Sequence, residues 1–169
     1  MNLWRFFNLI CIKTNMKDAD QLVWKCFAFQ EMSNTLLYNI LLERTKVFVV
    51  EQNCIFNDMD SIDMKSYHLV GFYDNAIAAY ARLMPPELTF KEMSIGRVLT
   101  PQLFRTKGFG KYLMEQAIDK CYEIFGEGDI KIGAQLYLKR FYEHFGFKPL
   151  GEIHNIDGIP HTLMLLKNK

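Results

Sequence analysis

One stretch near the middle of the chain constrains the fold more than any other. Residues Met93–Leu99 form a mostly apolar run of strand length that ends near Pro101. Beyond it, apolar residues recur at three- and four-residue spacing as far as Phe125, and Gly126 follows directly. This is the pattern of an amphipathic helix with a glycine at its end. The sequence therefore predicts a buried strand, a turn and a helix in succession.

The turn between this strand and helix, Arg105–Gly110, has the composition of an anion-binding site. The first backbone N–H groups of a helix lack partners within the helix, and the helix dipole places about half a positive charge there. Gly108 and Gly110 carry no side chain that would keep a bulky anion from the backbone. Arg105 and Lys107 add full positive charges. A pyrophosphate would fit this turn.

The same glycines could serve the turn alone, because glycine is common in turns that bind nothing. The pattern is not the dinucleotide-binding fingerprint, which needs a third glycine and an acidic residue about 20 positions further on. It is not a P-loop either, because no Gly-Lys-Ser/Thr follows. The motif by itself leaves both interpretations open.

Length and net charge indicate how many domains the chain forms and which binding partners are excluded. With 169 residues, half of them apolar, the chain is long enough for one globular domain. Twenty basic and nineteen acidic residues leave a net charge of +1, so no basic field exists to attract nucleic acid or an anionic membrane. We therefore expect neither as a partner.

The spacing of the cysteines and the length of the apolar runs indicate the cellular compartment of the protein and the extent of its folded domain. The cysteines are far apart, with no C-x-x-C and no histidine pair at ligand spacing, which favours a reduced cytoplasmic chain without a metal site. The apolar run Leu3–Ile12 is ten residues long, whereas a membrane-spanning helix needs about 20. We expect residues 1–20 to be an extension outside the fold, and residues 21–169 to form the single domain.

The remaining patterns predict strands and helices that interleave along the chain. Strands are expected at Leu22–Phe29, His68–Tyr73, Ile77–Met84, Met93–Leu99, Ile130–Gln135, Phe147–Ile153 and Leu163–Leu166, and helices after Ser33 or Asn34, up to Phe125, and over Leu136–Phe145. The end of the first helix is open, because Val47–Val50 favours a strand. This order predicts an α/β fold, a mixed sheet with helices on both faces.

Charged residues in two other settings need an interpretation. Asn57–Asp63 is an acidic loop that lacks the glycine and the terminal glutamate of a calcium loop, so a solvated loop is expected. Arg44, Arg82 and Arg97 all fall in apolar runs, which favours ion pairs in the core over contacts with a substrate.

This order of elements resembles the GNAT acetyltransferase superfamily over residues 22–166. The resemblance is carried by Ile95-Gly96-Arg97-Val98 before Arg105-x-x-Gly108-x-Gly110, by Ala134-Gln135, and by Phe141-Tyr142 before Phe145-Gly146-Phe147. Two more specific stretches, Arg44–Cys54 and Asp157–His161, are similar to the ElaA branch of that superfamily.

The resemblance implies a mixed, mostly antiparallel sheet of six to seven strands whose central strands splay apart. Acetyl-CoA would lie in the resulting cleft. The backbone of Val98 and Thr100 would pair with the pantetheine arm, and Gln135 stands at a strand end where many members place an asparagine that contacts pantetheine. The pyrophosphate would be held by the backbone amides of the turn, namely Arg105, Thr106, Lys107, Gly108, Phe109 and Gly110.

The reaction implied by the resemblance is direct attack of a primary amine on the thioester in a ternary complex. An amine with a pKa of about 10.4 costs about 4.6 kcal/mol to hold neutral at pH 7, so a base is needed. His161 and Glu51 are the chief candidates, with His68 and Glu152 also considered. The Val98 N–H would stabilise the oxyanion, and Tyr142 would be the general acid.

Another class of function is a non-catalytic module that binds or senses acyl-CoA. Such a module would keep the turn and lose the acid and base, so Tyr142 favours the enzyme. The sequence does not identify the amine acceptor, which is either a small molecule or a peptide, and it is compatible with a homodimer.

Overall fold

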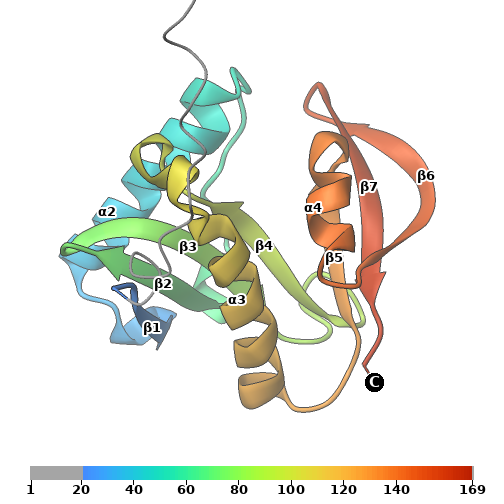
Figure 1. The fold of residues 1–169 in the computed structure, drawn as a ribbon, viewed down its shortest axis with the longest axis horizontal. Coiled ribbons are helices and arrows are strands. Elements are labelled where there is room, and N and C mark those ends of the chain that lie inside the picture. Colours follow the sequence, from blue (N-terminus) through green and yellow to red (C-terminus); the bar gives the residue numbers. More distant parts are fainter. Residues whose placement is uncertain (1–20, 169) are drawn as a thin grey trace, which may run out of the picture.

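The computed structural model describes residues 21–168, which form one seven-stranded sheet with the strand order β1-β2-β3-β4-β5-β7-β6 (Figure 1). The strands are β1 (Val23–Ala28), β2 (Tyr67–Tyr73), β3 (Ala76–Met84), β4 (Met93–Leu99), β5 (Ile130–Gln135), β6 (Lys148–Ile156) and β7 (Ile159–Leu166). Neighbouring strands are antiparallel except β4 and β5, which are parallel. The predicted mixed, mostly antiparallel α/β sheet is confirmed. The prediction for residues 1–20 falls outside the described residues.

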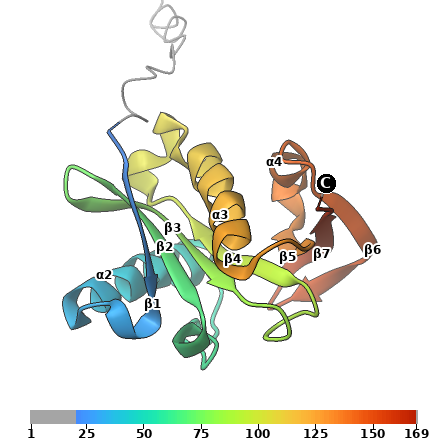
Figure 2. The same ribbon diagram turned by 90° about the horizontal axis from the view of Figure 1, so that it is seen from below.

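Helices cover both faces of the sheet, as predicted. They are α2 (Asn34–Arg44), the π-helix η2 (Thr45–Glu51) that continues it, α3 (Phe109–Phe125) and the short α4 (Lys139–Glu143). Figure 2 shows α3 and α4 on one side of the sheet and α2 on the other. Four 3-10 turns complete the set: η1 (Phe29–Glu31), η3 (Asp63–Lys65), η4 (Gln102–Lys107) and η5 (Leu136–Leu138).

The ends of the long helices follow from local chemistry. Ser33 caps α2, because its hydroxyl oxygen accepts a hydrogen bond from the Leu36 N–H at 3.2 Å. Gly126 ends α3 with a φ of 83°, a conformation that side chains disfavour, and its N–H donates to the Tyr122 carbonyl. Val47–Val50 extends the first helix in a π-helix instead of forming a strand.

Two apolar layers hold the helices to the sheet, and alternation along the strands divides side chains between them. On β2, Leu69 packs in the layer that contains α3, and its neighbour Val70 packs in the layer that contains α2. Ala81 and Tyr80 divide in the same way on β3. Because successive side chains point to opposite faces of a strand, these central strands are buried on both sides.

The two central strands separate soon after they begin. Parallel pairing between β4 and β5 is confined to Met93 with Ile130 and Ser94 with Lys131. Beyond Ser94 the strands diverge, which is the predicted splay. Within residues 21–168, no helix is long and apolar enough to cross a membrane.

The expectation of a solvated acidic loop was wrong. Asp58 and Asp63 are each only 5% exposed. Their carboxylates form ion pairs with Arg44 at 2.8 and 2.7 Å, and Asp63 also pairs with Arg82 at 2.7 Å. These two side chains are buried because the arginines supply the charge that a buried carboxylate requires, while Asn57, Met59 and Ser61 of the same loop are exposed. The core ion pairing expected for Arg44 and Arg82 is confirmed.

Candidate active site

The splay of β4 and β5 opens a cleft made of two adjoining cavities. The inner cavity, of about 250 Å³, is lined by residues that include Val98, Tyr142 and His161. The outer cavity, of about 380 Å³, is lined by residues that include Thr100, Arg105, Gly110 and Phe141. The two share Phe48, Gln52, Val98, Gln135 and Leu138. The cleft therefore leads from the start of α3 to the space between the splayed strands.

The predicted anion-binding turn borders the outer cavity through only part of its length. Gly108 has a φ of 75°, and α3 begins at the next residue. A Cβ added at Gly110 would meet Thr100 Oγ1 at 3.5 Å and Phe141 Cζ at 4.0 Å, which are ordinary contacts. The turn therefore leaves the backbone of Gly110 accessible beside the cavity.

Thr106, Lys107 and Phe109 of the turn do not line the outer cavity. The side chain of Phe109 is fully buried, with its ring centroid 5.4 Å from that of Tyr73. The Lys107 ammonium lies 4.9 Å from the centroid of the same Tyr73 ring, and Thr106 is exposed. Packing of Phe109 thus anchors the first turn of α3, while its backbone belongs to the segment predicted to bind pyrophosphate.

Glu51 and Arg105 form a bidentate ion pair beside the outer cavity. Arg105 Nη1 and Nη2 donate to Glu51 Oε1 and Oε2 at 2.6 and 2.7 Å, and Arg105 Nε donates to the Thr100 carbonyl at 3.0 Å. Hydrogen bonding to Arg105 lowers the pKa of Glu51. A carboxylate with a lowered pKa is a poorer proton acceptor at neutral pH, so this geometry favours a positioning role for Glu51.

Gln135 lines both cavities, and it is paired there with a residue that the sequence did not single out. The Gln52 amide donates to Gln135 Oε1 at 3.2 Å, and the Gln135 amide donates to Gln52 Oε1 at 3.0 Å. Gln52 follows Glu51 in the stretch that resembles the ElaA branch. Two consecutive residues at the end of η2 thus bind opposite sides of the cleft: Glu51 binds Arg105, and Gln52 binds Gln135.

Tyr142 combines burial with access to the inner cavity. Its residue is 7% exposed, and its ring meets those of Phe141 and Phe147 edge-on at centroid distances of 5.2 and 6.1 Å. Burial raises the pKa of the phenol, so the hydroxyl is protonated at neutral pH. Within residues 21–168 this hydroxyl has no hydrogen-bond partner.

His161 lies on β7 directly opposite Gln135 on β5, and it lines the inner cavity. Its Nδ1 is 2.8 Å from the Ile159 carbonyl. Because a carbonyl oxygen only accepts hydrogen bonds, the neutral ring carries its proton on Nδ1 and keeps a lone pair on Nε2. His161 is thus a ring with one nitrogen available as a proton acceptor.

The other two candidate bases do not reach the cleft. His68 is fully buried, 2.8 Å from the Tyr80 hydroxyl and 3.0 Å from the Asp63 carbonyl. Burial lowers its pKa, so the ring is neutral and structural. Glu152 is exposed on β6 and lines neither cavity.

The backbone of β4 is irregular where it passes the cavities. Gly96 pairs with Arg82 and Leu99 pairs with Tyr80, so Arg97 and Val98 together oppose the single residue Ala81. Arg97 has a φ of 51°, which costs a non-glycine residue roughly 1–2 kcal/mol. Val98 has no register partner on β3 or β5 within the described sheet, and it lines both cavities.

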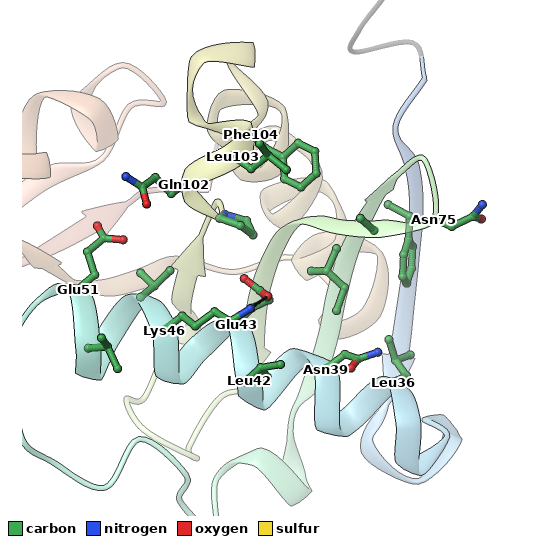
Figure 3. A pocket seen from close by; sticks show the side chains of 16 residues that line it. Leu36, Asn39, Leu42, Glu43, Lys46, Glu51, Asn75, Gln102, Leu103 and Phe104 are labelled. Carbon is green, nitrogen blue, oxygen red and sulfur yellow. Dashed lines mark hydrogen bonds and ion pairs between the residues drawn. The ribbon is translucent and has the colours of Figure 1, made fainter.

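A wider groove of about 810 Å³ adjoins the cleft at Glu51. Figure 3 shows side chains of α2 and η2 on one side of it and those of Gln102, Leu103 and Phe104 on the other. The Lys46 ammonium in this groove pairs with Glu43 at 2.7 Å. Glu51 lines the groove as well as the outer cavity, so its pair with Arg105 stands between them.

Among residues 21–168, no group of three or more His, Cys, Asp or Glu side chains is arranged to hold a metal ion. The inner cavity brings together the backbone of β4, the phenol of Tyr142 and the imidazole of His161.

Comparison with known proteins agrees with this geometry. Residues 40–168 match the acetyltransferase (GNAT) domain family. The chain is 35% identical to protein ElaA of Escherichia coli over 143 residues, which cover 83% of this chain and 94% of ElaA. It is 37% identical to a UPF0039 protein of Synechocystis over 145 residues, which cover 85% of this chain and 94% of that protein.

Solved structures give the same result. The crystal structure of Escherichia coli ElaA aligns with a TM-score of 0.80 at 34% identity, covering 85% of this chain and 98% of that one. An acyl-CoA N-acyltransferase from Pseudomonas aeruginosa aligns with a TM-score of 0.81 at 33% identity, with the same coverage. In sequence and in fold, the chain belongs to the GNAT acetyltransferase family, in its ElaA-like branch.

Proposed function

We propose that this member of an acyl-CoA-dependent acyltransferase family transfers an acetyl group from acetyl-CoA to a primary amine by direct attack in a ternary complex. The observation that carries the proposal is the inner cavity, where an unpaired stretch of β4, a protonated phenol and an imidazole with a free nitrogen surround one space of about 250 Å³. The outer cavity connects it to the turn before α3.

Binding of acetyl-CoA is assigned to the outer cavity. The amides from Arg105 to Gly110 would hold the pyrophosphate, and the backbone of Val98 and Thr100 would pair with the pantetheine arm. Gln135 lies at the junction through which that arm has to pass. Glu51 supports this function by holding the Arg105 guanidinium against the Thr100 carbonyl.

The chemistry is assigned to three groups around the inner cavity. His161 Nε2 takes a proton from the acceptor ammonium, and the freed amine forms the new C–N bond at the thioester carbon. The Val98 N–H stabilises the negative charge that develops on the carbonyl oxygen. As the C–S bond breaks, Tyr142 donates its proton to the departing thiolate. The second proton that the nitrogen loses as it becomes an amide restores the Tyr142 phenol, and His161 releases the first proton to solvent.

An acceptor screen tests the proposal. Purified protein is titrated calorimetrically with acetyl-CoA and then incubated with acetyl-CoA and a panel of a peptide, a polyamine and an amino sugar, while release of the CoA thiol is followed with a thiol reagent. Amine-dependent thiol release, with the acetylated amine identified by mass, is expected. Tight binding with no release for any amine would instead favour a non-catalytic acyl-CoA sensor.

The setting of the reaction is also proposed. We place the protein in the cytoplasm, which agrees with Cys26, Cys54 and Cys121 being free thiols. We expect neither nucleic acid nor a membrane among its partners, given the net charge of +1. A homodimer is compatible with this function, and sedimentation of the purified protein would determine the oligomeric state.

A further inference from the structure

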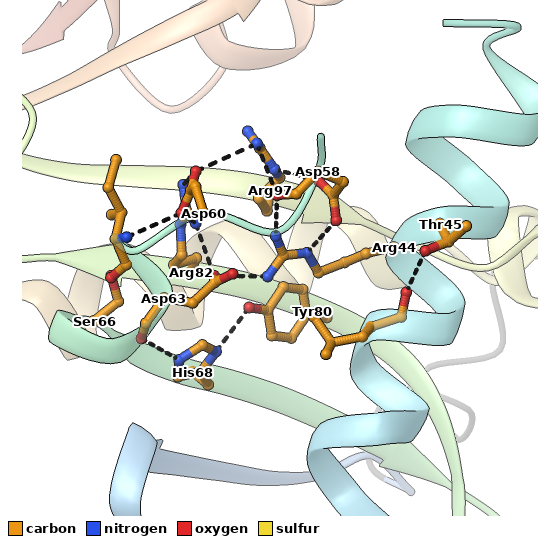
Figure 4. Close-up of polar contacts among 12 residues, drawn as sticks. Arg44, Thr45, Asp58, Asp60, Asp63, Ser66, His68, Tyr80, Arg82 and Arg97 are labelled. Carbon is orange, nitrogen blue, oxygen red and sulfur yellow. Dashed lines mark hydrogen bonds and ion pairs between the residues drawn. The ribbon is translucent and has the colours of Figure 1, made fainter. Parts of the chain in front are cut away.

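A largely buried cluster of arginines and aspartates lies beside the irregular part of β4 (Figure 4). We call it the arginine–aspartate cluster, and it consists of Arg44, Arg82, Arg97, Asp58, Asp60 and Asp63. Its three guanidinium groups and three carboxylates balance in formal charge. Arg44 is fully buried, and Arg82 is 3% exposed. The proposed reaction uses none of these side chains.

Asp58 is the branch point between the core and the cleft. Its Oδ2 accepts from Arg44 Nε at 2.8 Å, and its Oδ1 accepts from Arg97 Nε at 2.6 Å. The Asp58 carbonyl also accepts from Arg44 Nη2 at 2.7 Å and from Arg97 Nη2 at 3.3 Å. The fully buried Arg44 therefore holds Asp58, and Asp58 in turn holds Arg97.

The cluster contacts the irregular part of β4 through one arginine on β3 and one on β4. Arg82, on β3, is the register partner of Gly96 and is bound to Asp63 and Asp60. Arg97 is the next residue on β4 and is the one with a φ of 51°. Its guanidinium also lies 5.9 and 5.5 Å from the ring centroids of Phe48 and Phe56. The contacts of the Arg97 guanidinium thus restrain the side chain of the same residue whose backbone has the positive φ.

A contribution to the stability of the fold does not by itself explain the buried ion pairs of the arginine–aspartate cluster. Burying charges carries a desolvation cost, and apolar residues of similar volume often stabilise a fold at least as well as a buried ion pair. What the charges provide here is geometry, because a guanidinium that donates from Nε and Nη2 to a fixed aspartate has a defined orientation. That orientation restrains the backbone to which the guanidinium is attached.

We propose that Asp58 is a positioning residue which, through the Arg97 side chain, keeps Arg97 in its left-handed conformation and thereby orients the Val98 N–H toward the acyl carbonyl. The inference rests on the proposed function, in which Val98 supplies the oxyanion donor. Asp58 lines neither cavity, so it acts on the reaction only through Arg97. A left-handed residue turns the next peptide plane, and the direction of the Val98 N–H depends on that turn.

The test compares two substitutions of Arg97 that differ in backbone preference. Arg97→Ala removes the anchor and leaves a residue that disfavours a positive φ, whereas Arg97→Gly removes the same anchor and tolerates that φ. Asp58→Asn removes the carboxylate and keeps its volume. For each variant we would measure kcat, the KM for acetyl-CoA and the carbonyl stretching frequency of bound acetyl-CoA labelled with ¹³C at the carbonyl.

The expected result separates geometry from packing. In the wild-type protein the carbonyl stretch shifts to lower frequency on binding, because a hydrogen bond polarises the carbonyl. Arg97→Ala and Asp58→Asn should lose that shift and lower kcat by about tenfold or more, with KM changed by less than about threefold. Arg97→Gly should keep the shift, with a kcat at least about fivefold above that of Arg97→Ala.

Several outcomes would overturn the inference. Equal loss of kcat in Arg97→Ala and Arg97→Gly would mean that the guanidinium itself acts on the substrate. A full carbonyl shift in Asp58→Asn would mean that Asp58 only stabilises the fold, and thermal unfolding of each variant would show that effect separately. A wild-type protein without amine-dependent turnover would overturn the proposed function and this inference together.

Discussion

Tyr142→Phe is the substitution that most directly tests the proposed chemistry. It removes the phenolic oxygen and keeps the ring, whose edge contacts with Phe141 and Phe147 at 5.2 and 6.1 Å are unaffected. The lost hydroxyl has no hydrogen-bond partner within residues 21–168. No bond is broken by its removal, so the free energy of unfolding should change by less than about 1 kcal/mol.

The kinetic effect should be much larger than the effect on stability. Without the phenol the thiolate has to leave unprotonated or take its proton from water, and general acid catalysis contributes about 10²-fold or more to such steps. A loss of 10² in kcat corresponds to about 2.7 kcal/mol of transition-state stabilisation. The affinity for acetyl-CoA should remain unchanged, because the proton is needed only after the thioester has been attacked.

The assay is thiol release at saturating amine, together with calorimetric titration of acetyl-CoA and urea unfolding. Tyr67→Phe is the matched control, because the Tyr67 ring meets Phe125 edge-on at 5.7 Å in the same apolar layer and lines neither cavity. Wild-type turnover in Tyr142→Phe, combined with a loss of stability, would refute the reasoning. Tyr142 would then be a packing residue, and water would supply the proton.

Three further predictions concern the cofactor site, the N-terminus and the acid stability of the core. Gly110→Trp should place an indole in the outer cavity and weaken CoA binding at least about tenfold by calorimetry, whereas Asp119→Trp, at an exposed position of the same helix, should not. A chain that starts at Met16 should keep its Tm and CoA affinity, since it retains all seven strands of the described sheet, the first of which begins at Val23; a loss of several degrees would contradict this. Burial raises the pKa of Asp63, but hydrogen bonds from Arg44 and Arg82 outweigh it and leave that pKa lowered. Its contribution to stability is then present above the unfolded-state pKa of about 3.9 and lost as pH falls through the lower folded-state value. Asp63→Asn should therefore cost about 3 kcal/mol at pH 7 in urea unfolding, and the difference from wild type should narrow below pH 4; a constant difference would be the contrary result.

Local patterns in the sequence were sufficient to predict most of the fold. The boundaries predicted for β4 and β5 agree with the structure residue for residue. Ser33, one of the two predicted N-caps, begins α2, and Gly126 ends α3 as predicted. These features depend on side-chain periodicity and on backbone preferences of single residues, which act within a few positions along the chain. The family resemblance extended the prediction to the splay of the central strands.

The partners of charged and polar side chains were decided only by the tertiary structure. Glu51 meets Arg105 from 54 positions away, and Gln52 meets Gln135 from 83. Asp58 and Asp63, in the acidic loop that the sequence predicts to be solvated, are buried, because Arg44 reaches them from α2. Sequence spacing carries no information on such pairs, since a carboxylate can face water or a guanidinium with the same local pattern. The physical reason is that the charge of a side chain is local, whereas the free energy of burying that charge depends on what the rest of the fold brings beside it.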